Sequence, residues 1–102
     1  MRAMPEVYSI NQIKDVVSDV ARQYGVKKAA LFGSYSNGNA TAQSDIDIVI
    51  DKGRIRGLIM FNAFVGALED RLQKSVDVLT YSSLDNSLIK ASVDNEVVLY
   101  EQ

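Results

Sequence analysis

Residues 33–51 read GSYSNGNATAQSDIDIVID, and this stretch indicates how the rest of the chain folds. Its first part is small and polar, and its last part is an apolar run that contains acids. Residues two apart in a strand share a face, so Asp45 and Asp47 are predicted to point to one side. The isoleucines that alternate with them then point to the other side, into a core.

Two carboxylates on one strand face repel each other unless a cation lies between them. Mg²⁺ suits this position because it prefers carboxylate and phosphate oxygens as ligands. Asp77 is a third acid with apolar neighbours, in the sequence VDVL. If its strand lies beside that of Asp45 and Asp47, the three carboxylates form a two-metal site with ions roughly 3.5–4 Å apart. Alone, Asp77 would more often be an ion-pair partner, so the interpretation depends on the combination.

The loop that begins at Gly33 follows a predicted strand, which is typical of phosphate binding. Backbone N–H groups and the hydroxyl group of Ser34 are predicted to hold the terminal phosphates of a nucleotide. A P-loop is excluded, because Asn39 and Ala40 occupy the positions where that motif needs lysine and a hydroxyl residue. An EF-hand is also excluded, since apolar residues occupy the positions of an acid and a glycine in its calcium loop.

Hydrophobic periodicity predicts helices and strands on both sides of this stretch. Ser9 and Gln12 have the spacing of a capping box at the start of the first helix. The predicted helices cover residues 9–24 and 58–72, with a short one at 82–93, and the predicted strands cover residues 27–32, 45–51, 75–81 and 96–100. The order indicates an α+β or α/β domain, residues 1–102, with helices packed on a small sheet.

The composition excludes several classes of site. The chain of 102 residues has no cysteine and no histidine, so disulfides, imidazole zinc sites and Ser-His-Asp catalysis are all excluded. A net charge of −2 argues against direct binding of nucleic acid. No apolar run resembles a signal peptide or a membrane span, so we expect a soluble, cytoplasmic protein.

Gly33-Ser34, ten intervening residues and Asp45-Ile46-Asp47 resemble the G-S-x(10)-D-x-D signature of one enzyme superfamily. This is the nucleotidyltransferase superfamily that includes DNA polymerase beta. The sequences LFGSY and VDVLT are similar to those of its small prokaryotic branch, the minimal nucleotidyltransferases. The resemblance covers most of the chain, and the loop, the paired acids and the third acid occur in the expected order.

The resemblance implies the nucleotidyltransferase fold with a mixed sheet, and transfer of a nucleoside monophosphate from a nucleoside triphosphate. Asp45 and Asp47 would bind two Mg²⁺ ions, with Mn²⁺ as an alternative, and Asp77 would complete the site and help to activate the acceptor hydroxyl. Minimal nucleotidyltransferases commonly act beside HEPN-family toxins. The resemblance therefore implies an antitoxin that transfers AMP from ATP to a tyrosine of such a toxin. An antitoxin that acts only by forming a complex is the alternative, and homo-oligomerisation stays open.

One position departs from the family pattern. Many small members have an arginine before the glycine that closes the loop, where this chain has Asn37. Lys52, Arg54 and Arg56 are candidates to replace that positive charge. The chain also ends soon after its last predicted strand, so we expect a partner protein to supply the acceptor.

Overall fold

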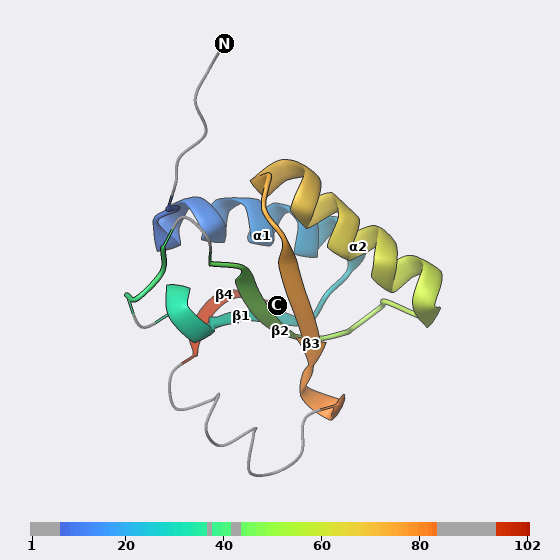
Figure 1. Ribbon diagram of the computed structural model, residues 1–102. Helices are drawn as coiled ribbons and strands as arrows, with labels where there is room; N and C mark the ends of the chain where they lie inside the picture. The colour runs from blue at the N-terminus through green and yellow to red at the C-terminus, as the bar shows by residue number, and fades with distance from the viewer. Residues whose placement is uncertain (1–6, 37, 42–43, 84–95) are drawn as a thin grey trace.

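The computed structural model describes residues 7–36, 38–41, 44–83 and 96–102. Two helices pack on one face of a single sheet (Figure 1). The strands, in chain order, are β1 (Lys28–Phe32), β2 (Ile46–Asp51), β3 (Val76–Thr80) and β4 (Val97–Glu101). They lie in the order β3-β2-β1-β4. β1 pairs antiparallel with β2 and β4, whereas β2 and β3 are parallel, so the predicted α+β class with a mixed sheet is confirmed.

Helix α1 (Ile10–Tyr24) begins with the predicted capping box. Oγ of Ser9 accepts the N–H of Gln12 at 3.1 Å, and Oε1 of Gln12 accepts the N–H of Ser9 at 2.8 Å. Gly25 ends the helix in the left-handed conformation with φ of 73°, which glycine adopts without strain. The side of α1 that faces the sheet is buried through Ile13, Val17, Val20 and Ala21.

β1 and β2 form an antiparallel pair whose long connection contains a short 3₁₀ helix, η1 (Gly33–Tyr35). Ile46, Ile48 and Ile50 are fully buried and belong to the same core as the inner residues of both helices. The alternation predicted from DIDIVID is therefore confirmed, and the odd-numbered residues of β2 lie on the face away from the helices.

Helix α2 (Gly57–Leu72) connects β2 to β3. Parallel strands need a crossover connection, and α2 supplies it while it buries Phe64, Leu68 and Leu72 against the sheet. At its end, a carboxylate oxygen of Glu69 accepts the N–H of Val76 at 3.0 Å. This contact joins the last turn of α2 to the first residue of β3.

The short helix predicted at residues 82–93 lies outside the described residues, except for Ser82 and Ser83. These two belong to the 3₁₀ turn η2 (Tyr81–Ser83) that follows β3. Within the described ranges, neither helix has the length and apolar character that a membrane span requires.

Candidate functional site

Asp47 and Asp77 are direct partners in the parallel pairing of β2 with β3. Both lie on the sheet face away from the helices, because the core-facing isoleucines alternate with Asp47 along β2. Asp47 is half-buried and Asp77 is exposed. The sequence-based expectation that the strand of Asp77 lies beside that of Asp47 is confirmed.

The environment of Asp47 disfavours its negative charge. Burial, the negative charge of Asp77, a hydrogen-bonding contact with Asp77 and, as the smallest effect, the charge of Asp45 raise the pKa of Asp47 from 3.8 to about 6. All four effects act in the same direction, and no cation opposes them. The carboxylates of β2 and β3 therefore form a local excess of negative charge that a bound cation would relieve.

Gly33 lies against the carboxylate of Asp47. A Cβ atom at Gly33 would lie 2.5 Å from Oδ2 of Asp47, and the φ angle of Gly33 is +75°. The close approach follows from the register, since Phe32, the last residue of β1, pairs with Asp47. The η1 turn is closed by Ser36, whose N–H and Oγ–H both donate to the carbonyl of Gly33, at 3.1 and 2.8 Å. The structure thus holds the predicted phosphate loop beside the predicted metal ligand.

Ser34, the other predicted nucleotide-binding residue, is the middle residue of η1. Its backbone is described and its side chain is not. The backbone of Ser34 therefore lies in the predicted phosphate loop, and the role of its hydroxyl group stays a prediction.

Asp45 immediately precedes β2 and is exposed. Across the described part of the chain, no three acidic side chains are close enough together to hold one ion. The structure therefore brings together Asp47 and Asp77, while Asp45 acts on Asp47 through its charge. The three-carboxylate metal site stays a prediction.

The donor set fits the magnesium that the family implies. Mg²⁺ is held by one or two carboxylates together with phosphate oxygens and water, so a complete cage of protein ligands is not needed. Asp47 and Asp77 would supply two such carboxylates, and Asp45 lies one residue before β2 as a third donor. The raised pKa of Asp47 is the electrostatic strain that such an ion would remove.

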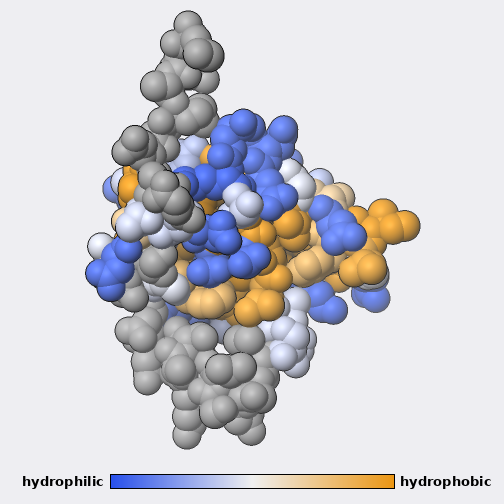
Figure 2. Space-filling model, viewed as in Figure 1, coloured by the Kyte–Doolittle hydropathy of each residue, from blue (hydrophilic) through white to orange (hydrophobic). Residues whose placement is uncertain are grey.

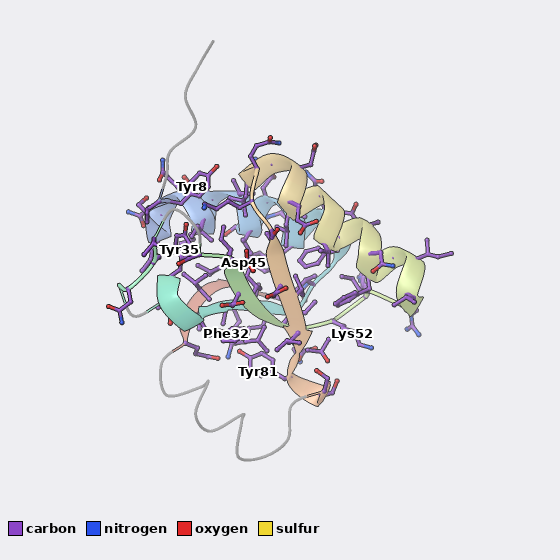
Figure 3. The ribbon with its side chains drawn as sticks, in the orientation of Figure 1. Tyr8, Phe32, Tyr35, Asp45, Lys52 and Tyr81 are labelled. Atoms are coloured by element: carbon purple, nitrogen blue, oxygen red, sulfur yellow. The ribbon has the colours of Figure 1, made fainter. Side chains whose placement is uncertain are left out.

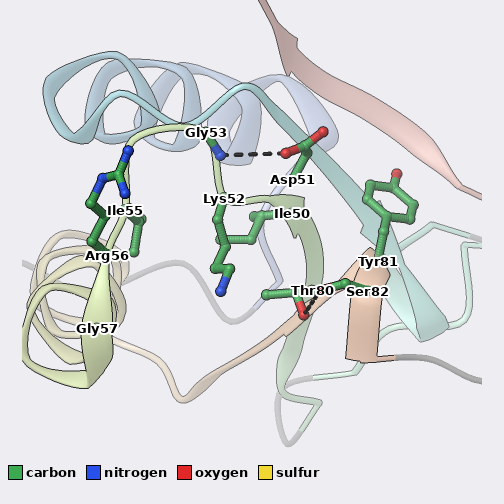
Figure 4. Close-up of a pocket in the computed structure, with 10 residues that line it drawn as sticks. All are labelled: Ile50, Asp51, Lys52, Gly53, Ile55, Arg56, Gly57, Thr80, Tyr81 and Ser82. Carbon is green, nitrogen blue, oxygen red and sulfur yellow. Dashed lines mark hydrogen bonds between the residues drawn. The ribbon is translucent and has the colours of Figure 1, made fainter.

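Lys52 and Arg56, in the loop after β2, do not lie beside Asp45, Asp47 and Asp77. Lys52 and Asp45 flank opposite ends of β2 (Figure 3). The five residues from Asp47 to Lys52 correspond to roughly 16 Å along a strand. Lys52 and Arg56 instead line a cavity of about 600 Å³ at the far end of the strands (Figure 4). The hypothesis that they replace the family's arginine in the phosphate loop is not supported by this position.

Sequence reasoning missed a polar cluster on the same sheet face as Asp47. Nζ of Lys28 lies 3.0 Å from Oε2 of Glu96, and the hydroxyl of Tyr81 donates to Oε1 of Glu96 at 2.6 Å. The Lys28 ammonium also lies 5.1 Å from the centre of the Tyr81 ring. The hydrogen bond to Glu96 raises the pKa of Lys28, and burial raises the pKa of Tyr81 to about 12.

This cluster links Lys28 of β1 with Tyr81, which follows β3, and with Glu96, which precedes β4, so it crosses the sheet. Ala30 and Val49, which also lie on the face away from the helices, are 0% and 1% exposed. That face therefore combines a covered apolar middle with the carboxylate pair. Lys28 and Glu96 are 68 positions apart, and no local sequence pattern signals their contact.

Comparisons with known proteins agree with this geometry. Residues 11–102 match the family profile described as polymerase beta, nucleotidyltransferase. A Methanocaldococcus jannaschii protein, provisionally named a protein adenylyltransferase, is 39% identical over 90 residues, 88% of this chain and 96% of that protein. The protein adenylyltransferase MntA of Thermococcus cleftensis is 36% identical over 80 residues, 78% of this chain and 80% of that protein.

The fold is also found in a solved complex from Shewanella oneidensis, described as a tri-AMPylated HEPN toxin with its MNT antitoxin. The match has a TM-score of 0.68 at 21% identity and covers 91% of this chain and 73% of the matched chain. At this identity the likeness concerns the fold alone.

Proposed function

Because the chain belongs to the polymerase beta-type nucleotidyltransferase family, we propose that it transfers AMP from ATP to a tyrosine hydroxyl of a HEPN-family toxin. The toxin would be inactivated by this modification, and the chain would act as its antitoxin. The observation that carries the proposal is the pairing of Asp47 with Asp77, with Gly33 in contact with Asp47. This pairing supports the proposal because the carboxylates that would hold a cation lie beside the loop that would hold phosphate.

In this reaction the acceptor oxygen forms a bond to the α-phosphorus of ATP. The bond from that phosphorus to the oxygen bridging to the β-phosphate breaks, and pyrophosphate leaves. The proton of the acceptor hydroxyl passes to a carboxylate, for which we propose Asp77, because it is exposed and lies beside Asp47. Backbone N–H groups of η1 would orient the phosphates.

Asp45, Asp47 and Asp77 would hold Mg²⁺, or Mn²⁺ in its place. Bound there, the ions would offset the negative charge that develops on the transferring phosphoryl group. The donor chemistry supports this role, since all three residues offer carboxylate oxygens and Asp47 carries charge that its surroundings do not compensate.

The names of relatives support the substrate and the partner. The Thermococcus cleftensis relative is named a protein adenylyltransferase, and the Shewanella oneidensis structure pairs the same fold with an AMPylated HEPN toxin. A second candidate function is neutralisation by complex formation alone. The lack of a compact three-acid group among the described residues favours this alternative.

One experiment separates the two functions. The chain is incubated with a HEPN-family partner protein, ATP and Mg²⁺, and the intact mass of that partner is measured. A gain of whole AMP units, lost when EDTA is added, is expected. A stable complex with unchanged partner mass would overturn the proposed transfer and favour neutralisation by binding.

A further inference from the structure

The first turn of α2 carries the two most exposed large apolar side chains of the described residues. Leu58 is 73% exposed and Ile59 is 89% exposed, whereas the next value, for Val7, is 45%. Figure 2 shows a hydrophobic projection at the edge where α2 begins, with hydrophilic residues beside it. Covering exposed apolar side chains of this kind with a partner lowers the free energy of the system.

Three cations precede this turn in the loop between β2 and α2. Lys52, Arg54 and Arg56 are all exposed. The two ion pairs found among the described residues, Lys28–Glu96 and Arg71–Asp19, do not involve them. The loop therefore presents positive charge to solvent, on a chain whose net charge is −2.

Backbone contacts fix this loop. The N–H of Arg54 donates to the carbonyl of Gly25 at 2.9 Å, and the N–H of Ile55 donates to the carbonyl of Lys52 at 3.0 Å. Ile55 is only 3% exposed and anchors the loop in the core. Gly53 packs so closely on Gly25 that any side chain there would collide with the Gly25 carbonyl oxygen. A partner would thus meet cations whose backbone is already ordered, which lowers the entropy cost of binding.

A cavity of about 600 Å³ adjoins the cations and the first residue of α2 (Figure 4). Lys52 and Arg56 line it together with the hydroxyl residues Thr80 and Ser82. The acid in its wall, Asp51, accepts the N–H of Gly53 through Oδ1 at 3.3 Å. The hollow therefore favours a protruding group with acidic or hydrogen-bond-accepting character.

The positive charge around Leu58 and Ile59 indicates which kind of partner binds this surface. In a two-fold contact between copies of this chain, the loop cations of one copy would face those of the other, and like charges at an interface are unfavourable. A partner with acidic side chains around an apolar patch would instead complement both parts of the surface.

We propose that Leu58, Ile59, Lys52 and Arg56 form the docking surface for such an acidic partner protein. The identity of the partner as a HEPN-family toxin rests on the proposed function. The surface lies at the far end of the sheet strands from the predicted metal ligands, because Lys52 follows β2 and Asp45 precedes it (Figure 3). An interface of ordinary size, about 800 Å² on each partner, is wide enough to extend from one to the other. Because the docking surface and the predicted metal ligands are different residues at opposite ends of β2, mutations can change partner binding and AMP transfer separately.

The test measures the dissociation constant with a HEPN-family partner protein, the same one used in the transfer experiment, by isothermal titration calorimetry. The variants are Leu58→Ser with Ile59→Ser, and Lys52→Glu with Arg56→Glu. We expect each pair to weaken binding at least about tenfold, since central apolar and arginine residues dominate interface energies. Added salt should weaken binding of the wild type more than binding of the charge-reversed variant.

Matched controls exclude a general effect of surface mutation. Val98→Ser removes an apolar side chain that is 42% exposed on β4, at the other end of the strand order, and should leave the dissociation constant unchanged. Circular dichroism and thermal melting should show that all variants fold, because every substituted side chain is exposed. Sedimentation of the chain alone tests for self-association.

The outcomes separate the docking surface from the proposed activity. Patch-dependent binding without AMP transfer would support the surface and overturn the activity. Unchanged affinity in both double variants, with AMP transfer intact, would overturn the surface and leave the activity. A wild type that neither binds the partner nor transfers AMP to it would overturn both. A wild-type dimer that Leu58→Ser with Ile59→Ser converts to a monomer would overturn the acidic partner in favour of a second copy.

Discussion

Gly33 leaves room for the carboxylate of Asp47, since a Cβ atom at Gly33 would lie 2.5 Å from Oδ2 of that residue. The glycine of the predicted phosphate loop and an acid of the neighbouring strand therefore pack directly against each other. A side chain at position 33 would have to displace Asp47 from its place beside Asp77. The loop and the carboxylate pair form one geometric unit.

Gly33→Ala is therefore expected to reduce AMP transfer by at least about tenfold, because small misplacement of a reacting group is costly. Because the φ angle at position 33 is +75°, alanine there should also lower the free energy of unfolding by roughly 1–2 kcal/mol. The control is Gly38→Ala in the same loop, where φ is +81° and no described residue comes within 4 Å of the place that a Cβ atom would take. Equal loss of transfer in both variants would show that loop strain, and not the Asp47 contact, matters.

Asp45→Asn with Asp47→Asn should preserve folding and reduce nucleotidyl transfer by orders of magnitude. The amides keep the size of the carboxylates and lose the charge that would hold the ions. Transfer is measured by intact mass of the partner, and folding by circular dichroism. A double variant that still modifies its partner would refute the assigned roles of both residues.

Mg²⁺ should raise the melting temperature of the chain, and more so with a non-hydrolysable ATP analogue present, because ligands that bind only the folded state stabilise it. The effect should vanish in the Asp45→Asn, Asp47→Asn variant. A wild-type melting temperature that does not respond to millimolar Mg²⁺ with nucleotide would count against the metal site.

Without metal, the stability of the chain should depend on pH through Asp47. Burial, followed by the charge of Asp77, raises its folded-state pKa to about 6, above the ordinary value of 3.8. Between these values the folded chain binds more protons than the unfolded chain, so this carboxyl stabilises at low pH and its contribution falls as pH rises through 6. Urea denaturation in EDTA of the wild type and of Asp47→Asn, compared at about pH 5 and at neutral pH, measures the difference. An equal pH response in both proteins would contradict the prediction.

Ser9→Ala should lower the free energy of unfolding by about 1 kcal/mol, because it removes the acceptor for the N–H of Gln12 at the start of α1. Ser9→Asp should retain most of the stability, since aspartate caps helices about as well as serine. Urea denaturation of the three proteins makes the comparison. A loss as large in Ser9→Asp as in Ser9→Ala would argue against a capping role.

Features that depend on local spacing could be predicted from the sequence. The capping box of Ser9 and the burial of alternate residues in β2 follow from patterns a few residues long. The apolar neighbours of Asp77 predict that it lies in a strand, and the family resemblance implies that this acid joins Asp47 in one site. Its one-to-one register with Asp47 could not be predicted, because that register depends on how α2, which connects the two strands, packs on the sheet.

Contacts between distant segments could not be predicted. Lys28 meets Glu96 across 68 positions, and only the pairing of β1 with β4 brings their segments together. The cations of the loop after β2 were interpreted as candidates for phosphate binding. These cations lie far from the acids because β2 separates them along its length. The positions of charged residues in the sequence do not reveal the direction in which that strand runs.

The crossover through α2 also sets a sequence of events during synthesis. Asp47 leaves the ribosome 30 residues before Asp77, its partner in the register. In the nascent chain, β1 and β2 can therefore pair before the repulsion between the two carboxylates exists. The charge conflict arises only when α2 and β3 are in place, because the crossover through α2 brings Asp77 beside Asp47. The paired carboxylates that could bind a cation therefore come together only after β1, β2 and α2 have been synthesised.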